Sequence, residues 1–194
     1  MENTLHILGI SGSLRTGSIN RGLLIAASEM MPEGMTLEIA DIAGIPLYNE
    51  DDFAESVPEA VNYLKEQILQ ADGIVIATPE YNHSIPGVLK NAIDWASRPR
   101  KTQPFAGKPV AVMGAGGRSG TVGAQAHLKQ VAAALGMEVL LAPEVAVQRA
   151  WEKFDENGGL VDENTRQLLK EQMAAFKEFI LTKSEGEKID SIPV

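Results

Sequence analysis

Short apolar runs alternate with stretches of helical periodicity from the start of the chain to about residue 140. This alternation is typical of βαβ units, in which each buried strand of a parallel sheet is followed by a helix that crosses back over the sheet. Residues 73–78 are apolar on both faces, which indicates a central strand. The pattern predicts five strands, over residues 5–10, 35–39, 73–78, 109–113 and 138–141.

Helices are expected between these strands, because apolar residues recur there at helical spacing. Ser56 and Glu59 form a capping-box pattern, Ser84 is a candidate N-cap, and Gly136 follows the predicted end of a helix. Residues 142–162 are expected to form a long connection. The predicted helices cover residues 18–31, a stretch carrying Ala60, Val61, Leu64 and Ile68, a stretch carrying Ile85, Val88, Leu89, Ala92 and Ile93, residues 121–135, and residues 164–181.

The second predicted strand alternates strictly between apolar and polar residues, so one of its faces is expected to contact water at an edge of the sheet. An edge position favours the strand order 2-1-3-4-5 in a doubly wound, three-layer α/β/α fold. In that order the chain leaves neighbouring strands 1 and 3 in opposite directions, which creates a ligand crevice beyond their C-terminal ends. We expect a single domain over residues 1–182 and a polar C-terminal tail over residues 183–194.

Composition narrows the possible chemistry. The chain has 17 Lys and Arg against 26 Asp and Glu, a formal net charge of −9, and no cysteine. The acidic balance argues against nucleic-acid binding and against a polybasic membrane surface. Absence of cysteine excludes disulfides, a thiol nucleophile and thiolate metal sites. No targeting or membrane-spanning segment is visible, so a cytoplasmic location is expected.

The loop after the first strand carries the strongest binding signal. It leads into a helix N-terminus, whose free N–H groups and dipole favour an anion. The loop contains no G-x-G-x-x-G pattern, and the chain has no nucleotide-hydrolysing P-loop motif. We therefore interpret it as a cradle for a phosphate monoester; the alternative is an ordinary Ser/Gly turn that caps a helix. The donors in and after the loop are Ser11, Ser13, Arg15, Thr16, Ser18 and Asn20.

Two further loops are expected at the same sheet edge. Residues 79–84 offer the ring of Tyr81 and the amide of Asn82, which suit the face and edge of a planar heterocycle. Residues 114–120 are rich in glycine, which allows a backbone to approach a ligand closely. For each loop the alternative is a generic turn between a strand and a helix.

Residues 13–20, combined with residues 79–82, resemble the NAD(P)H-dependent FMN reductase family. Its members include quinone, chromate and azo reductases of flavodoxin-like fold. Residues 85–95, 107–110 and 152–155 are also similar to the family, so the resemblance extends over nearly the whole chain.

The resemblance implies a set of FMN contacts. Ser13, Arg15, Ser18 and Asn20 match residues that hold the phosphate, and Ile19 supplies a backbone N–H. Residues of the second loop match those that contact the ribityl chain and the isoalloxazine; they are Pro79, Glu80, Tyr81 and Asn82. Gly116 lies in the third flavin loop, where several relatives carry serine, so only backbone contacts are implied there.

The resemblance also implies an activity. NAD(P)H reduces bound FMN, which a quinone, azo compound, chromate or free flavin then reoxidises in a ping-pong cycle, and FMN carries the chemistry without a catalytic side chain. Family members are commonly homodimers or homotetramers. Two alternatives stay open: a non-catalytic electron carrier, and a nicotinamide-dinucleotide binding module that uses Asp41. The sequence identifies neither the electron acceptor nor a preference for NADH or NADPH.

No metal site is predicted, because the three histidines, His6, His83 and His127, have no metal-ligand spacing.

Overall fold

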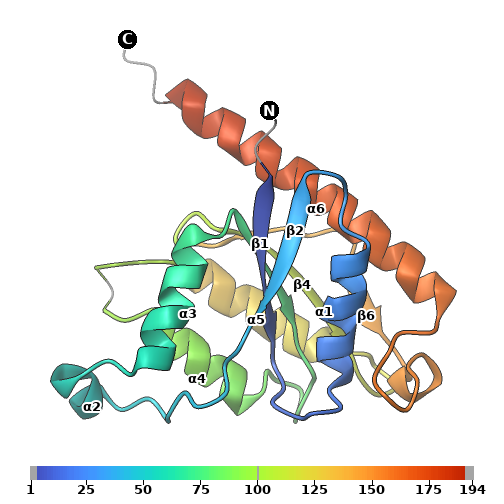
Figure 1. Ribbon diagram of the computed structural model, residues 1–194, viewed down its shortest axis with the longest axis horizontal. Coiled ribbons are helices and arrows are strands. Elements are labelled where there is room, and N and C mark those ends of the chain that lie inside the picture. The colour runs from blue at the N-terminus through green and yellow to red at the C-terminus, as the bar shows by residue number, and fades with distance from the viewer. Residues whose placement is uncertain (1–3, 100, 191–194) are drawn as a thin grey trace.

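The computed structural model describes residues 4–99 and 101–190, and its centre is a parallel sheet (Figure 1). Hydrogen-bonded neighbours follow the order β2-β1-β3-β4-β5, with β6 also paired to β4. The predicted flavodoxin-like order is thereby confirmed. The strands are β1 (Leu5–Ser11), β2 (Met35–Ala40), β3 (Gly73–Ala77), β4 (Pro109–Ala115), β5 (Glu138–Val139) and β6 (Val145–Val147).

The amphipathic second strand lies at the edge, as its alternation predicts. β2 pairs with β1, from Leu5 opposite Met35 to Ile10 opposite Ala40. Thr36 and Glu38 on β2 are exposed, whereas all five residues of β3 are buried. This contrast reflects the number of covered faces, since a central parallel strand is enclosed on both sides.

The fifth position in the sheet differs from the prediction. β5 ends at Val139, and β6 then continues alongside β4, with Met113 opposite Val145 and Ala115 opposite Val147. Strand β6 was therefore not predicted, and it lies inside the expected connection over residues 142–162. Pro143 separates the two pieces, and a proline has no N–H to donate to a continuous ladder.

Helices cover both faces of the sheet. One core cluster joins the sheet to α3, α4 and α5, and the other joins it to α1 and α6. The three-layer arrangement is thereby confirmed. The helices are α1 (Ile19–Glu29), α2 (Glu50–Glu55), α3 (Glu59–Gln70), α4 (Gly87–Ala96), α5 (Val122–Ala134) and α6 (Glu163–Asp190), with a 3₁₀ turn, η1, at Ala150–Glu152.

Two predicted helix caps are wrong. Ser56 does not begin α3 but ends α2, where its N–H donates to Asp52 O at 3.0 Å. Ser84 lies before the start of α4, and the residue before each helix is a proline, Pro58 and Pro86, without a side-chain cap bond. Proline fixes φ near the helical value, so it can lead directly into a helix.

The predicted helix end at Gly136 is correct, since Gly136 has φ 71° just beyond α5. At the start of α1, Ser18 caps the helix by accepting a hydrogen bond from Arg21 N at 3.2 Å. The last helix extends to Asp190, so most of the predicted tail continues α6; residues 191–194 lie outside the described part of the chain. Within residues 4–99 and 101–190, no helix combines the length and the apolar composition needed to cross a bilayer.

Candidate functional site

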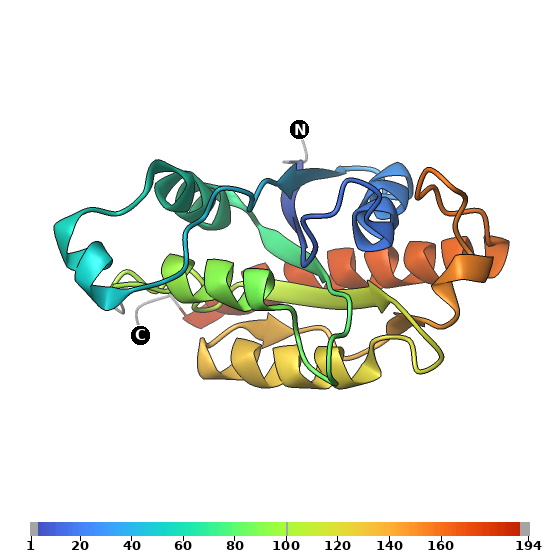
Figure 2. The same ribbon diagram turned by 90° about the horizontal axis from the view of Figure 1, so that it is seen from below.

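Three loops gather at the edge where β1, β3 and β4 end, which faces the viewer in Figure 2. Parallel strands direct their C-terminal ends to one edge, so the loops that follow them converge. The chain leaves β1 for α1 on one face of the sheet and leaves β3 for α4 on the other. The first and second loops therefore flank the position predicted for the ligand.

The β1–α1 loop begins in close contact with the second loop. Gly12 N donates to Ala77 O at 2.8 Å. A Cβ at Gly12 would lie 3.1 Å from Pro79 Cδ and 3.2 Å from Leu89 Cδ2, so a larger residue would force the two loops apart. Ser11 is buried, and its hydroxyl donates to Ser13 O at 3.4 Å. These contacts fix where the loop starts.

The same loop then presents hydrogen-bond donors to solvent. Within the described residues, the backbone N–H groups of Leu14, Thr16 and Gly17 have no hydrogen-bond partner. Arg15 is exposed and forms no ion pair with a described residue. Ser13 is half-buried, and its hydroxyl accepts from Arg15 N at 3.4 Å. Free N–H groups, hydroxyls and a guanidinium beside a helix N-terminus fit a phosphate dianion.

Asn20 differs from the other residues of this group. It is 1% exposed, and its amide donates to Ala115 O and accepts from Ala115 N, both at 2.9 Å. On β4, Met113 O accepts from Thr78 N, so the backbone groups of Met113 face β3. The direction of these groups alternates along a strand, so those of Ala115 face the same side, beyond the last bond between β4 and the β3 segment. The Asn20 side chain thus forms the bonds that a further residue of β3 would form, and it joins the first loop to the end of β4.

The second loop contains a tight turn that exposes Tyr81 and Asn82. Tyr81 and Ser84 form an isolated antiparallel bridge. Glu80 is directed away from solvent: its Oε2 accepts from Ala124 N at 2.9 Å, and its Oε1 lies 3.3 Å from His83 Nδ1. Its carboxylate therefore caps the N-terminus of α5, and the exposed side chains of the loop are those of Tyr81, Asn82 and His83.

The third loop uses its glycines mainly for packing. Gly116 N donates to Val147 O at 3.0 Å, and Gly116 O accepts from Ala150 N at 2.9 Å. A Cβ at Gly116 would lie 2.6 Å from Gly120 O, and one at Gly114 only 2.0 Å from Thr121 Oγ1. Both peptide groups of Gly116 are thus engaged with the protein, and residues 117–119 form the exposed tip of the loop.

A cavity of about 360 Å³ opens beside the first loop, on the side of β2. Ser13, Arg15 and Asp41 line it. Asp41 was the candidate ribose acid of the dinucleotide alternative, and its Oδ1 accepts from Ala43 N at 2.8 Å. Among the residues that the structure describes, no cluster of three or more His, Asp or Glu side chains could hold a metal ion.

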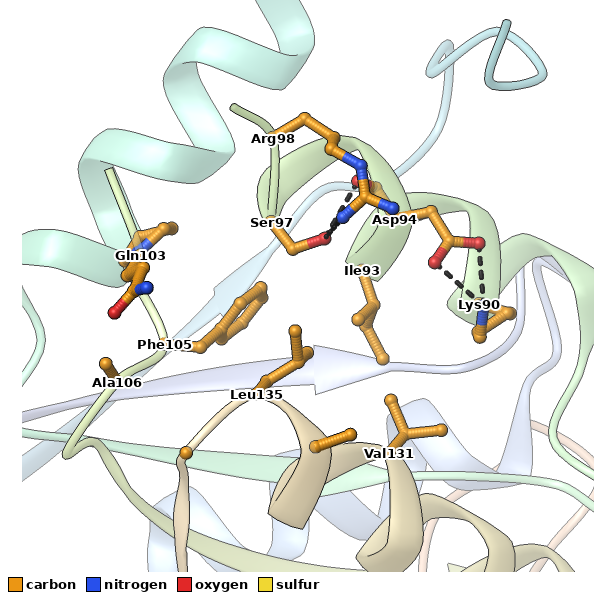
Figure 3. Close-up of a pocket in the computed structure, with 13 residues that line it drawn as sticks. Lys90, Ile93, Asp94, Ser97, Arg98, Gln103, Phe105, Ala106, Val131 and Leu135 are labelled. Carbon is orange, nitrogen blue, oxygen red and sulfur yellow. Dashed lines mark hydrogen bonds and ion pairs between the residues drawn. The ribbon is translucent and has the colours of Figure 1, made fainter. Parts of the chain in front are cut away.

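Another cavity, of about 530 Å³, lies between α4 and α5 and is lined by none of the predicted site residues (Figure 3). Ile93, Phe105 and Leu135 form its apolar floor, and Lys90 pairs with Asp94 at 2.8 Å on its rim. Ser97 and Arg98, at the C-terminal end of α4, also line it, whereas the crevice loops lie at the other end of that helix. Its residues belong to a region distinct from the crevice.

Two connections that support the loops were not predicted from the sequence. The first is the pairing of Asn20 with Ala115, and the second is a contact of 2.7 Å between Ser84 Oγ and His127 Nδ1. The positions in these pairs are 95 and 43 residues apart, so no local pattern reveals them.

Comparison with known proteins identifies the family of the chain. The family model described as NADPH-dependent FMN reductase matches residues 5–152. An NAD(P)H-dependent FMN reductase of Pseudomonas aeruginosa is 51% identical over 178 residues, covering 91% of this chain and 96% of the relative. A 2-hydroxy-1,4-benzoquinone reductase of Burkholderia sp. is 41% identical over 177 residues, covering 91% and 96%. A flavoenzyme NAD(P)H:(acceptor) oxidoreductase from Paracoccus denitrificans superposes with a TM-score of 0.84 at 35% identity, covering 92% and 98%.

Proposed function

The chain belongs to the NADPH-dependent FMN reductase family and is a flavin-dependent oxidoreductase, and from this premise we propose that its FMN lies in the crevice between the β1–α1 loop and residues 79–84. The observation that carries this proposal is the donor set of the first loop. Its N–H groups and the Arg15 guanidinium, which have no partner among the residues that the structure describes, lie together beside the N-terminus of α1. A phosphate monoester with nearly two negative charges requires this combination.

Each part of the crevice has a distinct task in this proposal. Ser13, Arg15 and the backbone of residues 14–19 bind the phosphate, and Ser18 holds the start of α1 in place. Pro79, Tyr81 and Asn82 contact the ribityl chain and the ring, while Glu80 fixes their loop to α5. Asn20 supports the phosphate loop through Ala115 rather than through an exposed amide. Gly116 supports the third loop in the same way, through its own peptide groups.

When bound, FMN supplies the redox chemistry, because it accepts a hydride from a nicotinamide and passes electrons on to a second substrate. The chain needs no acid, base or nucleophile for this, and its residues bind and orient the cofactor. Tyr81 is 54% exposed, so one face of the proposed site is accessible. We infer that NAD(P)H and the acceptor use this face in turn, which gives ping-pong kinetics.

Quinones are the acceptors that we favour, because the relative from Burkholderia is a 2-hydroxy-1,4-benzoquinone reductase. Azo compounds, chromate and free flavins are further candidates. Purified protein that is loaded with FMN should oxidise NADH or NADPH with menadione, and double-reciprocal plots at several menadione concentrations should be parallel. An electron carrier would show almost no turnover without a partner reductase, and colourless protein that binds NADPH but not FMN would support the dinucleotide alternative.

We further propose that the chain forms a homodimer or homotetramer in which a second copy helps to wall the crevice. A large exposed side chain lies in or just after each loop: Leu14 in the first, Tyr81 in the second and Val122 after the third. Side chains of this kind, gathered at one edge, favour coverage by a partner or a substrate. Sedimentation equilibrium would measure the oligomeric state. A cytoplasmic location is also proposed, and cell fractionation would test it.

A further inference from the structure

The turn over residues 81–84 has a backbone conformation that most residues seldom adopt. Both central residues lie in the left-handed region, Asn82 at φ 52° and His83 at φ 60°. Neither is glycine, so the surrounding structure must offset the cost of each conformation. Tyr81 N donates to Ser84 O at 3.1 Å, and Ser84 N donates to Tyr81 O at 3.0 Å. These bonds fix the shape of the turn but not its place in the fold.

Helix α5 anchors the turn at both ends. Before the turn, Glu80 Oε2 accepts from Ala124 N at 2.9 Å, and at its end Ser84 Oγ lies 2.7 Å from His127 Nδ1. Ala124 and His127 are three residues apart and therefore share one face of the helix. A Cβ at Gly123 would lie 3.1 Å from Glu80 Oε2, so glycine at this position lets the turn approach the helix closely.

We propose that His127 is a positioning residue, which acts through Ser84 to hold the turn that presents Tyr81 and Asn82 to the flavin ring. The inference rests on the proposed FMN site. Tyr81 is more than half exposed, so its orientation depends on the turn more than on packing around its own ring. Among the described residues, the contact between Ser84 and His127 is the second hydrogen-bonded link between the turn and α5, beside the Glu80 anchor.

The contact between His127 and Ser84 can form in either protonation state of the imidazole. A neutral ring with a free Nδ1 accepts a hydrogen bond from the Ser84 hydroxyl, and a protonated ring donates one to Ser84 Oγ. The role is therefore structural support of the turn, and it needs no proton transfer from His127.

The first test compares flavin affinities of the full-length protein after removal of bound FMN, measured by flavin fluorescence. His127→Ala and Ser84→Ala should each raise the Kd of FMN and of riboflavin by about threefold to tenfold, the effect of losing one hydrogen bond. The two flavins should lose affinity equally, because they share the ring and differ in the phosphate. The double variant should be no weaker than either single variant, since both act on one contact.

Two variants serve as controls. His127→Asn places an amide atom where Nδ1 lies and can therefore bond to Ser84, so it should keep both Kd values within about twofold of the wild type. Gln130→Ala removes an exposed side chain from the same helix and should leave both Kd values and the visible circular dichroism of bound FMN unchanged.

The second readout needs no flavin. Amide hydrogen exchange over residues 79–85 of the flavin-free protein should be faster in His127→Ala and Ser84→Ala than in the wild type or in Gln130→Ala. The inference is overturned if the wild type binds FMN while His127→Ala leaves the Kd values and the exchange unchanged, or if the losses in the double variant are additive. A wild-type protein that binds no FMN would instead overturn the proposed function, and this inference with it.

Discussion

Replacing Asn20 by alanine tests the connection between the first loop and the sheet. The side chain of Asn20 forms two hydrogen bonds of 2.9 Å with the backbone of Ala115, and both residues are 1% exposed. Alanine at position 20 removes both bonds and leaves the N–H and the C=O of Ala115 buried without partners. Such groups cannot recover their hydrogen bonds from water unless the loop opens.

The two hydrogen bonds set the size of the effect. Each contributes about 1 kcal/mol net, and an unsatisfied buried donor or acceptor adds a desolvation cost. We therefore expect Asn20→Ala to lower the free energy of unfolding by roughly 2–4 kcal/mol. For a domain of this length, each kcal/mol shifts Tm by about 2–4 °C, so Tm should fall by roughly 5–15 °C.

The assay is urea unfolding and thermal unfolding of the flavin-free protein, with Asn62→Ala on the exposed side of α3 as the matched control. Asn20→Asp is a second variant for the same unfolding assays. An ionised aspartate directs a carboxylate oxygen at Ala115 O, whereas a protonated aspartate can donate to it. The folded-state pKa of this aspartate should therefore be raised, and stability relative to the wild type should improve as pH falls. A loss below about 0.5 kcal/mol in Asn20→Ala, the range of ordinary surface substitutions, would refute the reasoning.

Two further substitutions probe the supporting structure. Gly22→Ala should destabilise the fold by about 1–3 kcal/mol in chemical unfolding, because a Cβ there would lie 1.9 Å from Gly158 O; Gly87→Ala, with open space around the Cβ, should not. Asp162→Ala should cost about 1 kcal/mol at pH 7, because Asp162 caps α6. A hydrogen bond from Lys153 lowers the pKa of Asp162 to about 2, so this stabilisation is complete only above about pH 5, where the aspartate is ionised in the unfolded chain as well. It should be lost as pH falls towards 2, and a pH-independent cost would contradict the assignment.

The strand order and the convergence of the three loops could be predicted because they depend on local patterns. Residues 35–39 alternate between apolar and polar side chains, which indicates an edge strand, and parallel strands bring their following loops to one edge. Strand β6 was missed because it has only three residues and follows Pro143. Helix α2 was missed because its first turn is wholly acidic and its six residues contain little apolar periodicity.

The supports of the site could not be predicted, because they depend on distances that only the folded chain defines. The local sequence does not show whether the Asn20 amide contacts a phosphate or Ala115. Burial of the side chain in the folded chain decides between the two. Likewise, Ser84 is a plausible helix cap from its local sequence, but Pro86 begins the next helix and frees the hydroxyl for His127.

The central claim is that the β1–α1 loop binds the phosphate of FMN, and the selectivity between FMN and riboflavin tests it most directly. Arg15→Ala should raise the Kd of FMN roughly tenfold to a hundredfold, the effect of a lost charge-assisted hydrogen bond, and should leave the Kd of riboflavin nearly unchanged. Arg118→Ala, an exposed arginine of the third loop, controls for the change in net charge. Equal losses for both flavins, or no loss for FMN, would contradict the claim.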